Sequence, residues 1–285
     1  MRDLKLLAEA HPAIKRDEAG RASCYRLPRG EGPRVTFGER VALHVGQQVM
    51  SFLEGTLLPG WLGELAEKLD DFDVPGASAT ASRLVPRLTF VSEPSRSYGA
   101  RDEVIATLFK ALLEDRVVTV DYARDGTLEL HPYALAIYRR ALYLLAWNPS
   151  DHRKQTLAVD RMATCVLGTG TFRRREEHDP ARDVDGYFGI WREPAPERVV
   201  LRFHPDKRAL LEARHWHGTA RLEPAADGRV DLVMHAGGRE LVSFALEWGK
   251  ACEVIEPAWL RDEVQAELRG ALAGYVAAGQ EREDQ

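Results

Sequence analysis

Five short stretches between residues 117 and 159 have the composition of β-strands, and their close spacing limits the folds open to this chain. They are Val117–Tyr122, Leu128–Pro132, Ala134–Tyr138, Leu142–Trp147 and Gln155–Val159. Two of the segments between them, Arg124–Gly126 and Asn148–Asp151, carry Asp, Gly, Asn, Pro and Ser, which favour tight turns, and Arg139–Ala141 forms a third short connection. Strands this short and this tightly joined predict a small β-barrel.

Composition and length describe an ordinary globular chain. The 285 residues are 45% hydrophobic and 29% charged, with a net charge of −5, which excludes a disordered chain, a collagen and a coiled-coil rod. The longest uncharged run, Val41–Leu53, has thirteen residues, whereas a membrane-spanning helix needs about 20. The N-terminus lacks the apolar stretch of a secretory signal. Three widely spaced cysteines, Cys24, Cys165 and Cys252, favour a reducing compartment, so a cytoplasmic protein of two or three domains is expected.

Charge alternates along the chain. Residues 1–34 and 116–178 each carry +3, whereas residues 35–115 carry −5 and residues 179–285 carry −6. The two basic segments are either anion or nucleic-acid faces or ordinary variation in composition.

The first hundred residues predict helices around one hairpin. Residues 3–10 predict a short helix, and Ile14–Leu27 predicts a hairpin with its turn at Asp17–Gly20. Thr36 and Glu39 have capping-box spacing and open a helix to Leu53. A second helix is expected over Trp61–Phe72, after Pro59-Gly60. Residues 73–100 look irregular, with one candidate strand at Arg87–Val91.

The rest of the chain predicts a helix before the barrel and an α/β unit after it. Asp102 opens a helix to about Asp115. The later unit is expected as strand Val199–Phe203, helix Asp206–His215, strands Ala220–Pro224 and Val230–His235, helix Glu240–Trp248 and strand Cys252–Ile255. This βαββαβ order is the ferredoxin-like plan. A last helix is expected over Leu260–Tyr275, followed by a frayed tail over residues 280–285.

No motif specifies catalysis or a metal. Gly-rich phosphate loops are absent, and Gly168-Thr169-Gly170 is interpreted as a turn. His215 and His217 lack the spaced partners of a zinc site, and the cysteines lack a neighbouring base. We therefore expect a protein that is not an enzyme, without catalytic residues, metal ligands or a cofactor.

Four motifs, taken in order, resemble one known family. They are Arg116–Tyr122, His131-Pro-Tyr-Ala-Leu135, Arg139-Arg-Ala-Leu-Tyr-Leu144 and Thr156–Met162. This series resembles the WYL domain of bacterial transcriptional regulators, with Leu142-Tyr143-Leu144 in the place of the namesake tripeptide. Residues 197–275 are similar to the C-terminal extension, called WCX, that usually follows.

The resemblance implies a fold and a domain plan. It implies an α+β chain: a partial winged helix-turn-helix at 1–34, a helical dimerisation linker at 35–97, an Sm-like (SH3-type) barrel at 98–178 and a ferredoxin-like extension at 195–279. It also implies a ligand-responsive transcriptional regulator whose barrel senses a nucleic-acid or nucleotide-like effector.

The resemblance also implies ligand-binding positions. The matching positions are His131, Tyr143 and Arg161, and Gln155 stands where the family has an arginine. Arg139 and Arg140 lie nearby and are candidates to compensate for that change, and Tyr133 of the second motif completes the set of ligand-binding candidates. The family has arginines where this chain has Gln155 and Ala158, which weakens anion binding because Arg forks phosphate oxygens. The alternatives are structural: Tyr143 as a core residue, Arg161 paired with an acidic neighbour, and His131 at an exposed edge.

The N-terminus resembles the end of a recognition helix and a wing. The basic residues expected to contact DNA phosphates are Arg2, Lys5, Lys15, Arg16 and Arg21. The N-terminal half of such a helix reads bases, and the chain begins inside it. Two interpretations follow: a longer protein, or a shortened member that does not bind DNA and works through an effector or a protein partner. The expected partners are DNA, the effector and a second copy of the chain, with no membrane.

Overall fold

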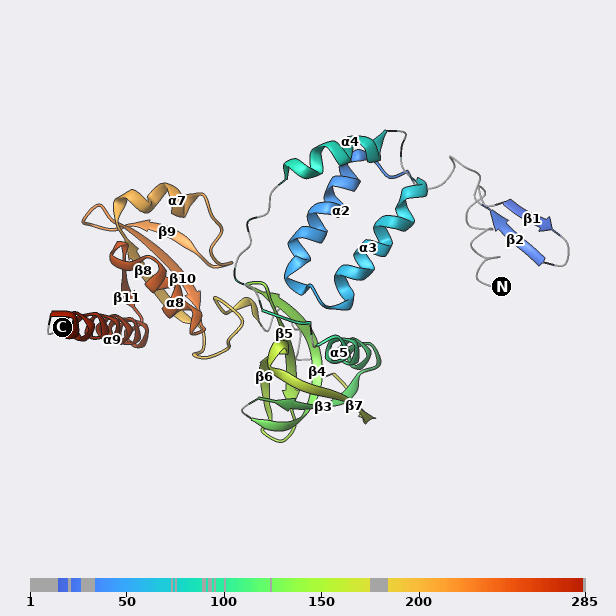
Figure 1. Ribbon diagram of the computed structural model, residues 1–285. Coiled ribbons are helices and arrows are strands. Elements are labelled where there is room, and N and C mark those ends of the chain that lie inside the picture. The colour runs from blue at the N-terminus through green and yellow to red at the C-terminus, as the bar shows by residue number, and fades with distance from the viewer. Residues whose placement is uncertain are drawn as a thin grey trace. The chain divides into compact units, whose positions relative to one another are not determined.

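The computed structural model describes most of the chain. It covers residues 15–19, 22–26, 34–72, 74, 76–88, 91, 94, 96–99, 101–123, 125–174 and 184–283. The described residues divide into two compact units, one built from residues up to Phe109 with Asp121–Arg124 and Val159–Val166, and the other from the remainder. Figure 1 labels the helices and strands of the chain.

The predicted hairpin near the N-terminus is present. β1 (Lys15–Ala19) pairs antiparallel with β2 (Ala22–Arg26), and Lys15 lies opposite Arg26. Asp17, Glu18 and Ala19, which were predicted to form the turn, lie in β1 instead. The predicted helix over 3–10 and the DNA-contact candidates Arg2, Lys5 and Arg21 lie outside the described residues. Lys15 and Arg16 are described only in their backbone.

Helices follow the hairpin in the first unit. α2 (Phe37–Val49) begins with the predicted capping box, because the Thr36 amide donates to the Glu39 carboxylate at 2.7 Å and the Glu39 amide to the Thr36 hydroxyl at 3.3 Å. The bond from the Thr36 amide lowers the pKa of the Glu39 carboxyl. Arg40 ties α2 to α3 (Leu57–Leu69) through the Ala66 carbonyl at 3.1 Å and the Asp70 carboxylate at 2.8 Å.

Two predictions in this unit are wrong. α3 begins at Leu57, capped by the Thr56 hydroxyl, so Pro59 lies in the first turn, where its missing N–H has no helical partner to lose. α4 (Ala77–Leu84) occupies a stretch predicted as irregular, and a 3₁₀ turn over Val85–Arg87 replaces the start of the predicted strand.

α5 (Asp102–Glu114) is present where the sequence predicted it. Its stripe of Val104, Ile105, Leu108 and Ala111 is buried. Acidic side chains in its first turn, Asp102 and Glu103, suit the positive end of the helix dipole.

A five-stranded sheet follows α5 in the order β6-β5-β4-β3-β7. Its strands are β3 (Arg116–Tyr122), β4 (Gly126–Tyr138), β5 (Ala141–Asn148), β6 (Arg153–Ala158) and β7 (Met162–Thr171). β4 pairs antiparallel with β5, and β5 with β6. β4 is one strand, not two, because Pro132 is accommodated by a register shift between Pro132 and Ala134.

The turn predicted over residues 168–170 is also wrong. Gly168-Thr169-Gly170 lies inside this strand, although the sequence indicated a turn. A Cβ on Gly168 would come within 2.9 Å of the Val117 carbonyl oxygen. The glycine is therefore explained by close approach of two backbones.

The C-terminal part has the predicted order of strands and helices. A four-stranded sheet, ordered β11-β8-β10-β9, is formed by β8 (Glu197–Phe203), β9 (Arg221–Pro224), β10 (Val230–Ala236) and β11 (Cys252–Glu256). The helices are α7 (Arg208–Glu212), α8 (Glu240–Glu247) and α9 (Ala258–Glu283). α7 is shorter than predicted, since a 3₁₀ turn takes Pro205–Lys207. α9 continues to Glu283, through most of the stretch predicted to fray.

The core of this part lies on one face of the four-stranded sheet. Phe203, Leu201, Leu232 and Met234 from the strands pack with Phe244 of α8, and all are at most 4% exposed. Phe203 also meets Trp248 edge to face, with ring centroids 5.1 Å apart.

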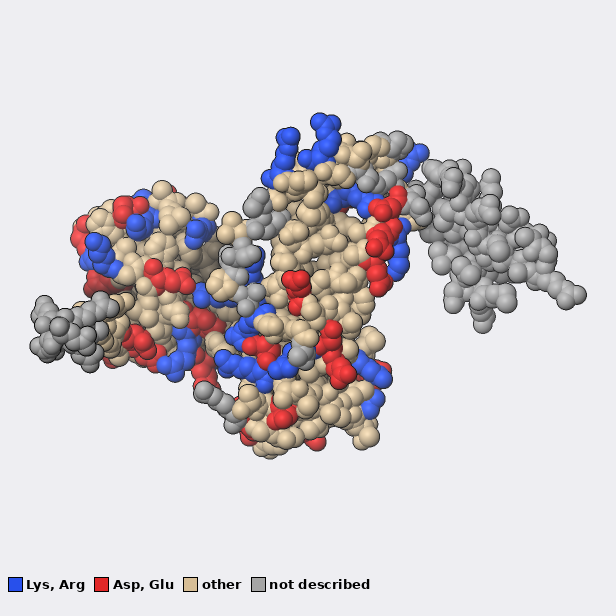
Figure 2. All heavy atoms as spheres, viewed as in Figure 1, with Lys and Arg blue, Asp and Glu red and all other residues tan. Residues whose placement is uncertain are grey.

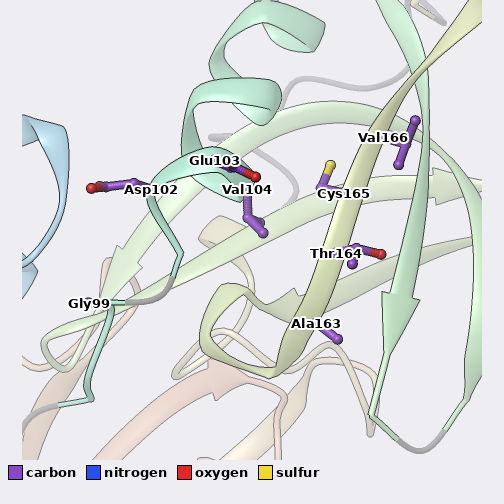
Figure 3. Close-up of a pocket in the computed structure, with 8 residues that line it drawn as sticks. All are labelled: Gly99, Asp102, Glu103, Val104, Ala163, Thr164, Cys165 and Val166. Atoms are coloured by element: carbon purple, nitrogen blue, oxygen red, sulfur yellow. The ribbon is translucent and has the colours of Figure 1, made fainter.

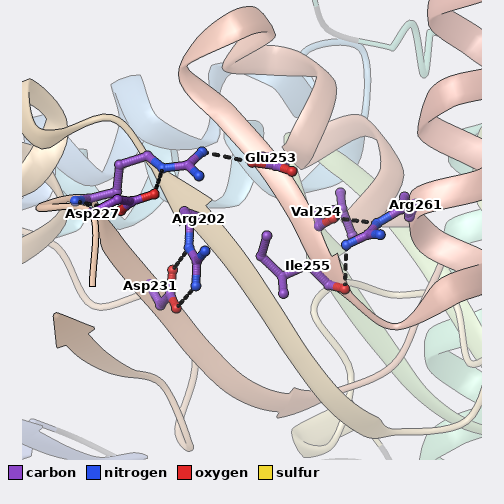
Figure 4. A network of polar contacts seen from close by, with 8 residues as sticks. Arg202, Asp227, Asp231, Glu253, Val254, Ile255 and Arg261 are labelled. Atoms are coloured by element: carbon purple, nitrogen blue, oxygen red, sulfur yellow. Dashed lines mark hydrogen bonds and ion pairs between the residues drawn. The ribbon is translucent and has the colours of Figure 1, made fainter. Parts of the chain in front are cut away.

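Ion pairs lie on the other face of this sheet. Arg202 donates to both oxygens of Asp231 at 2.7 and 2.8 Å, and Arg229 bridges Asp227 and Glu253, each at 2.7 Å (Figure 4). The hydrogen bond from Arg229 lowers the pKa of the Asp227 carboxyl. Figure 2 shows basic and acidic side chains interspersed over the C-terminal part. Paired charges of this kind make a poor surface for a polyanion.

Among the described residues, no helix has both the length and the apolar character needed to cross a membrane.

Candidate functional site

Most of the predicted ligand residues lie on strands β4, β5 and β6. The register places Ala136, Tyr143 and Ala158 side by side across the three strands, and His131 opposite Trp147. Side chains two residues apart on a strand share a face, so Tyr143, Leu145 and Trp147 share one face of β5. This face, from His131 to Tyr143, is called the Tyr143 face below.

Tyr143 is enclosed. It is 5% exposed and belongs to a cluster with Ala141, Leu145, Ala158 and Ile190. Its ring meets Trp191 edge to face at 6.1 Å and Tyr138 at 6.5 Å. The two residues Ile190 and Trp191 come from the segment that precedes β8, so this part of the Tyr143 face is covered by the chain itself.

His131 and Tyr133 share one aromatic partner. Phe172, just after β7, stacks on His131 at 4.8 Å with an interplanar angle of 8°, and contacts Tyr133 at 5.7 Å. Tyr133 is 5% exposed. Three rings from two segments therefore form an aromatic group at the far end of the face from Tyr143.

Arg139 and Arg140 form the turn between β4 and β5. Both have positive φ angles, 45° and 55°, a conformation that is uncommon for residues other than glycine. The Arg139 guanidinium lies 5.6 Å from the centroid of the Tyr138 ring and 3.7 Å from the Glu247 carboxylate of α8. Burial raises the pKa of the Tyr138 hydroxyl, so it stays a neutral donor.

Gln155 sits on β6 beside a polar turn. Its amide nitrogen donates to Asp151 at 3.1 Å, and Asn148 donates to the same carboxylate at 3.1 Å. The amide oxygen of Gln155 is buried without a hydrogen-bond partner among the described residues. This orphaned acceptor is a position where a ligand donor would be stabilised.

Arg161 belongs to the other compact unit. Its side chain is exposed, and its carbonyl accepts the Ala123 amide at 3.3 Å. The neighbouring Asp160 pairs with Arg96 at 2.7 Å, and its carbonyl accepts from Arg101 at 3.3 Å. The structure therefore gathers six of the seven predicted positions in one unit and Arg161 in the other.

A separate open cavity of about 430 Å³ lies between α5 and β7. Eight residues line it: Gly99, Asp102, Glu103, Val104, Ala163, Thr164, Cys165 and Val166. The Asp102 side chain points away from Cys165 (Figure 3). Across the described ranges, no group of three or more His, Cys, Asp or Glu side chains is arranged to hold a metal ion.

Two thiols are expected to be unreactive at neutral pH. Burial raises the pKa of Cys165 and of Cys252 to about 12, so both stay protonated and weakly nucleophilic at pH 7. Iodoacetamide should label them slowly in the folded chain, and faster only as the pH rises from 9.0 toward about 12. Peptide mass spectrometry measures the rates, with the urea-unfolded chain as control. Equal rates in folded and unfolded chains would contradict the burial.

Sequence reasoning missed three residues of this region. Phe172 follows the glycine pair that was interpreted as a turn, so its place beside His131 was hidden. Ile190 and Trp191 lie between the two predicted folding units and carry no periodic signal. The sequence offered one indication that this segment packs against a domain: an aliphatic and an aromatic residue lie next to each other in it.

Two family models and two solved structures match this chain. The family model "WYL domain" matches residues 103–167, and the model "WCX domain" matches residues 195–272. Proteasome accessory factor B/C (PafBC) of Arthrobacter aurescens is 16% identical, with a TM-score of 0.31, over 92% of this chain and 39% of that chain. A structure described as a CRISPR Cas-related protein is 9% identical, with a TM-score of 0.43, over 62% of this chain and 52% of that one.

The chain thus spans about half or less of the length of these two structures. The two family models lie in the order that the motifs predicted, and together they span half of the chain. The chain therefore contains a WYL domain over residues 103–167, followed by a WCX domain over residues 195–272.

Proposed function

We propose that this chain is a ligand-responsive transcriptional regulator that senses a nucleic-acid or nucleotide-like effector on the Tyr143 face of its WYL domain. The observation that carries the proposal is the combination at one end of that face: two adjacent arginines on a fixed turn, beside the rings of Tyr138 and Tyr143. An arginine guanidinium can donate two hydrogen bonds to phosphate oxygens, and an aromatic ring can stack on a nucleic-acid base.

The remaining features of the proposal concern the whole protein. The sheet around Tyr143 is proposed to be an Sm-like barrel within residues 98–178, and the βαββαβ unit to be ferredoxin-like within 195–279. Residues 1–34 are proposed as the winged-helix part that contacts DNA phosphates, and residues 35–97 as a linker that supports a homodimer. We place the protein in the cytoplasm.

The test of the effector is binding of a short fluorescein-labelled single-stranded DNA, followed by fluorescence anisotropy. Changing Arg139 and Arg140 together to Gln should weaken binding about tenfold or more. The slope of log K against log salt should fall by about 0.7 for each phosphate that the variant no longer neutralises. Gln keeps part of the aliphatic stem, so packing is retained while the guanidinium is removed.

The matched control changes Arg208 and Arg269, two arginines of the WCX domain, to Gln. This pair removes the same charge, with expected binding close to wild type. Equal weakening in the two double variants would show that only net charge matters, and would contradict a site at the turn. Binding of single strands without any affinity for duplex DNA from its own upstream region would favour the alternative, an effector-sensing member that works with a partner.

A further inference from the structure

One connecting segment forms backbone hydrogen bonds with the WCX domain, and two of its side chains cover Tyr143 in the WYL domain. This segment, residues 184–194, is called the strap below. All of its residues lie in the same compact unit as the Tyr143 face and the WCX domain.

The backbone of the strap is bound to the turn between β10 and α8. The Phe188 amide donates to the Gly237 carbonyl at 2.8 Å, and the Gly237 amide donates back to the Gly186 carbonyl at 3.1 Å. The Gly238 amide donates to the Pro194 carbonyl at 3.0 Å. The Phe188 ring also enters the WCX core, 4.7 Å from Phe244.

Glu240, the first residue of α8, accepts hydrogen bonds from the middle of the strap. Its Oε1 accepts the backbone amides of Ile190 at 2.6 Å and of Trp191 at 3.1 Å. Glu240 is 7% exposed, and a Cβ on Gly189 would come within 2.2 Å of its carboxyl carbon. A carboxylate that is buried this far is stabilised by the hydrogen bonds it accepts.

The side chains of Ile190 and Trp191 pack against the WYL domain, around Tyr143. Ile190 joins the cluster around Tyr143, Trp191 meets the Tyr143 ring, and the Thr156 hydroxyl donates to the Ile190 carbonyl at 3.4 Å. The two residues that Glu240 binds are therefore the two that cover Tyr143.

We propose that the strap is a cover over the Tyr143 face, held shut by Glu240, and that an effector binds the face by displacing it. This inference rests on the proposed function. Because the strap backbone belongs to the WCX domain, uncovering Tyr143 changes how that domain contacts the WYL sheet. Effector occupancy is then coupled to the arrangement of the two domains by a two-state element.

The first test measures hydrogen exchange of the full chain by mass spectrometry. Glu240→Gln should speed exchange in peptides of residues 184–194 by about tenfold or more, because the charge-assisted hydrogen bonds are weakened. Peptides from β8 and β10 should exchange as in wild type, which shows that the WCX sheet stays folded. Gly189→Ala attacks the same contact from the strap side and should give the same result. Glu253→Gln, which removes an exposed carboxylate from the same domain, should leave the strap unchanged.

The second test measures affinity for the labelled single-stranded DNA. A closed cover lowers apparent affinity by the fraction of open molecules, so both loosened variants should bind more tightly than wild type. Unchanged exchange of the strap overturns the inference whether or not the probe binds. Faster exchange with unchanged affinity also overturns it. A probe that binds no variant contradicts the proposed effector instead, and strap exchange alone then decides whether Glu240 holds the segment.

Discussion

Gly237→Ala is expected to destabilise the WCX domain by about 3 kcal/mol. Its Cβ would lie 2.4 Å from the Pro194 carbonyl oxygen and 2.8 Å from two further backbone atoms, at Ala195 and Pro196. Backbone atoms cannot rotate aside as a flexible side chain can, so the turn itself must move. That movement would break the hydrogen bonds from Phe188 and to Gly186 as well.

The measurement is urea-dependent hydrogen exchange of the slowest amides in β8 and β10, which reports this domain within a chain of several domains. Gly218→Ala is the control, since nothing lies within 4 Å of its Cβ and its φ is not in the left-handed region. It should stabilise slightly, by about 0.4–1 kcal/mol, because alanine restricts the unfolded chain. Similar losses in both variants would contradict a clash specific to Gly237.

The elements that sequence patterns predicted well are those with a strong local signal. The capping box at Thr36 and Glu39 placed the start of α2, and Asp102 placed the start of α5. Alternation and turn residues gave the order of strands and helices between β8 and β11. In each case the side chains that decide the structure are neighbours in the chain.

Wrong predictions arose where one residue type can serve two different structural roles. Pro59 is a helix breaker in an interior and harmless in a first turn, which is where α3 places it. Gly168 was interpreted as a turn residue, but it allows β7 to approach Val117. α4 consists mainly of Ala, Ser and Thr, and its packing against α2 joins residues that are distant in the sequence.

The candidate site shows the same division. Tyr143 and the arginine turn came from a family resemblance, and their strand positions followed from alternation. The Glu240 contact could not be predicted, because fifty residues separate its carboxylate from Ile190 and an acidic residue at a helix start already has a local reason in the helix dipole. The strap is bound to the WCX domain and covers part of the WYL domain. Local sequence patterns cannot predict such an arrangement, because it depends on contacts between residues far apart in the chain.

Phe203→Ala is expected to cost about 3–5 kcal/mol, the range for deleting a buried aromatic side chain. Phe203 is fully buried on β8 and packs edge to face on Trp248. The change removes this ring contact and leaves a cavity among aliphatic side chains that are held by the sheet. The same exchange measurement on β10 amides should show the loss, and it should be independent of protein concentration.

Tyr275→Ala is the matched control, since it deletes an aromatic ring from α9 where the side chain is 81% exposed. In a monomer its effect should stay within about 0.5 kcal/mol. The apolar neighbours Leu268, Leu272 and Val276 are also at least half exposed, so this part of α9 has little packing of its own. A loss at Tyr275 that grows with protein concentration would place α9 in the contact between two copies, and would support the proposed homodimer. A large loss at every concentration would contradict the exposure of this helix.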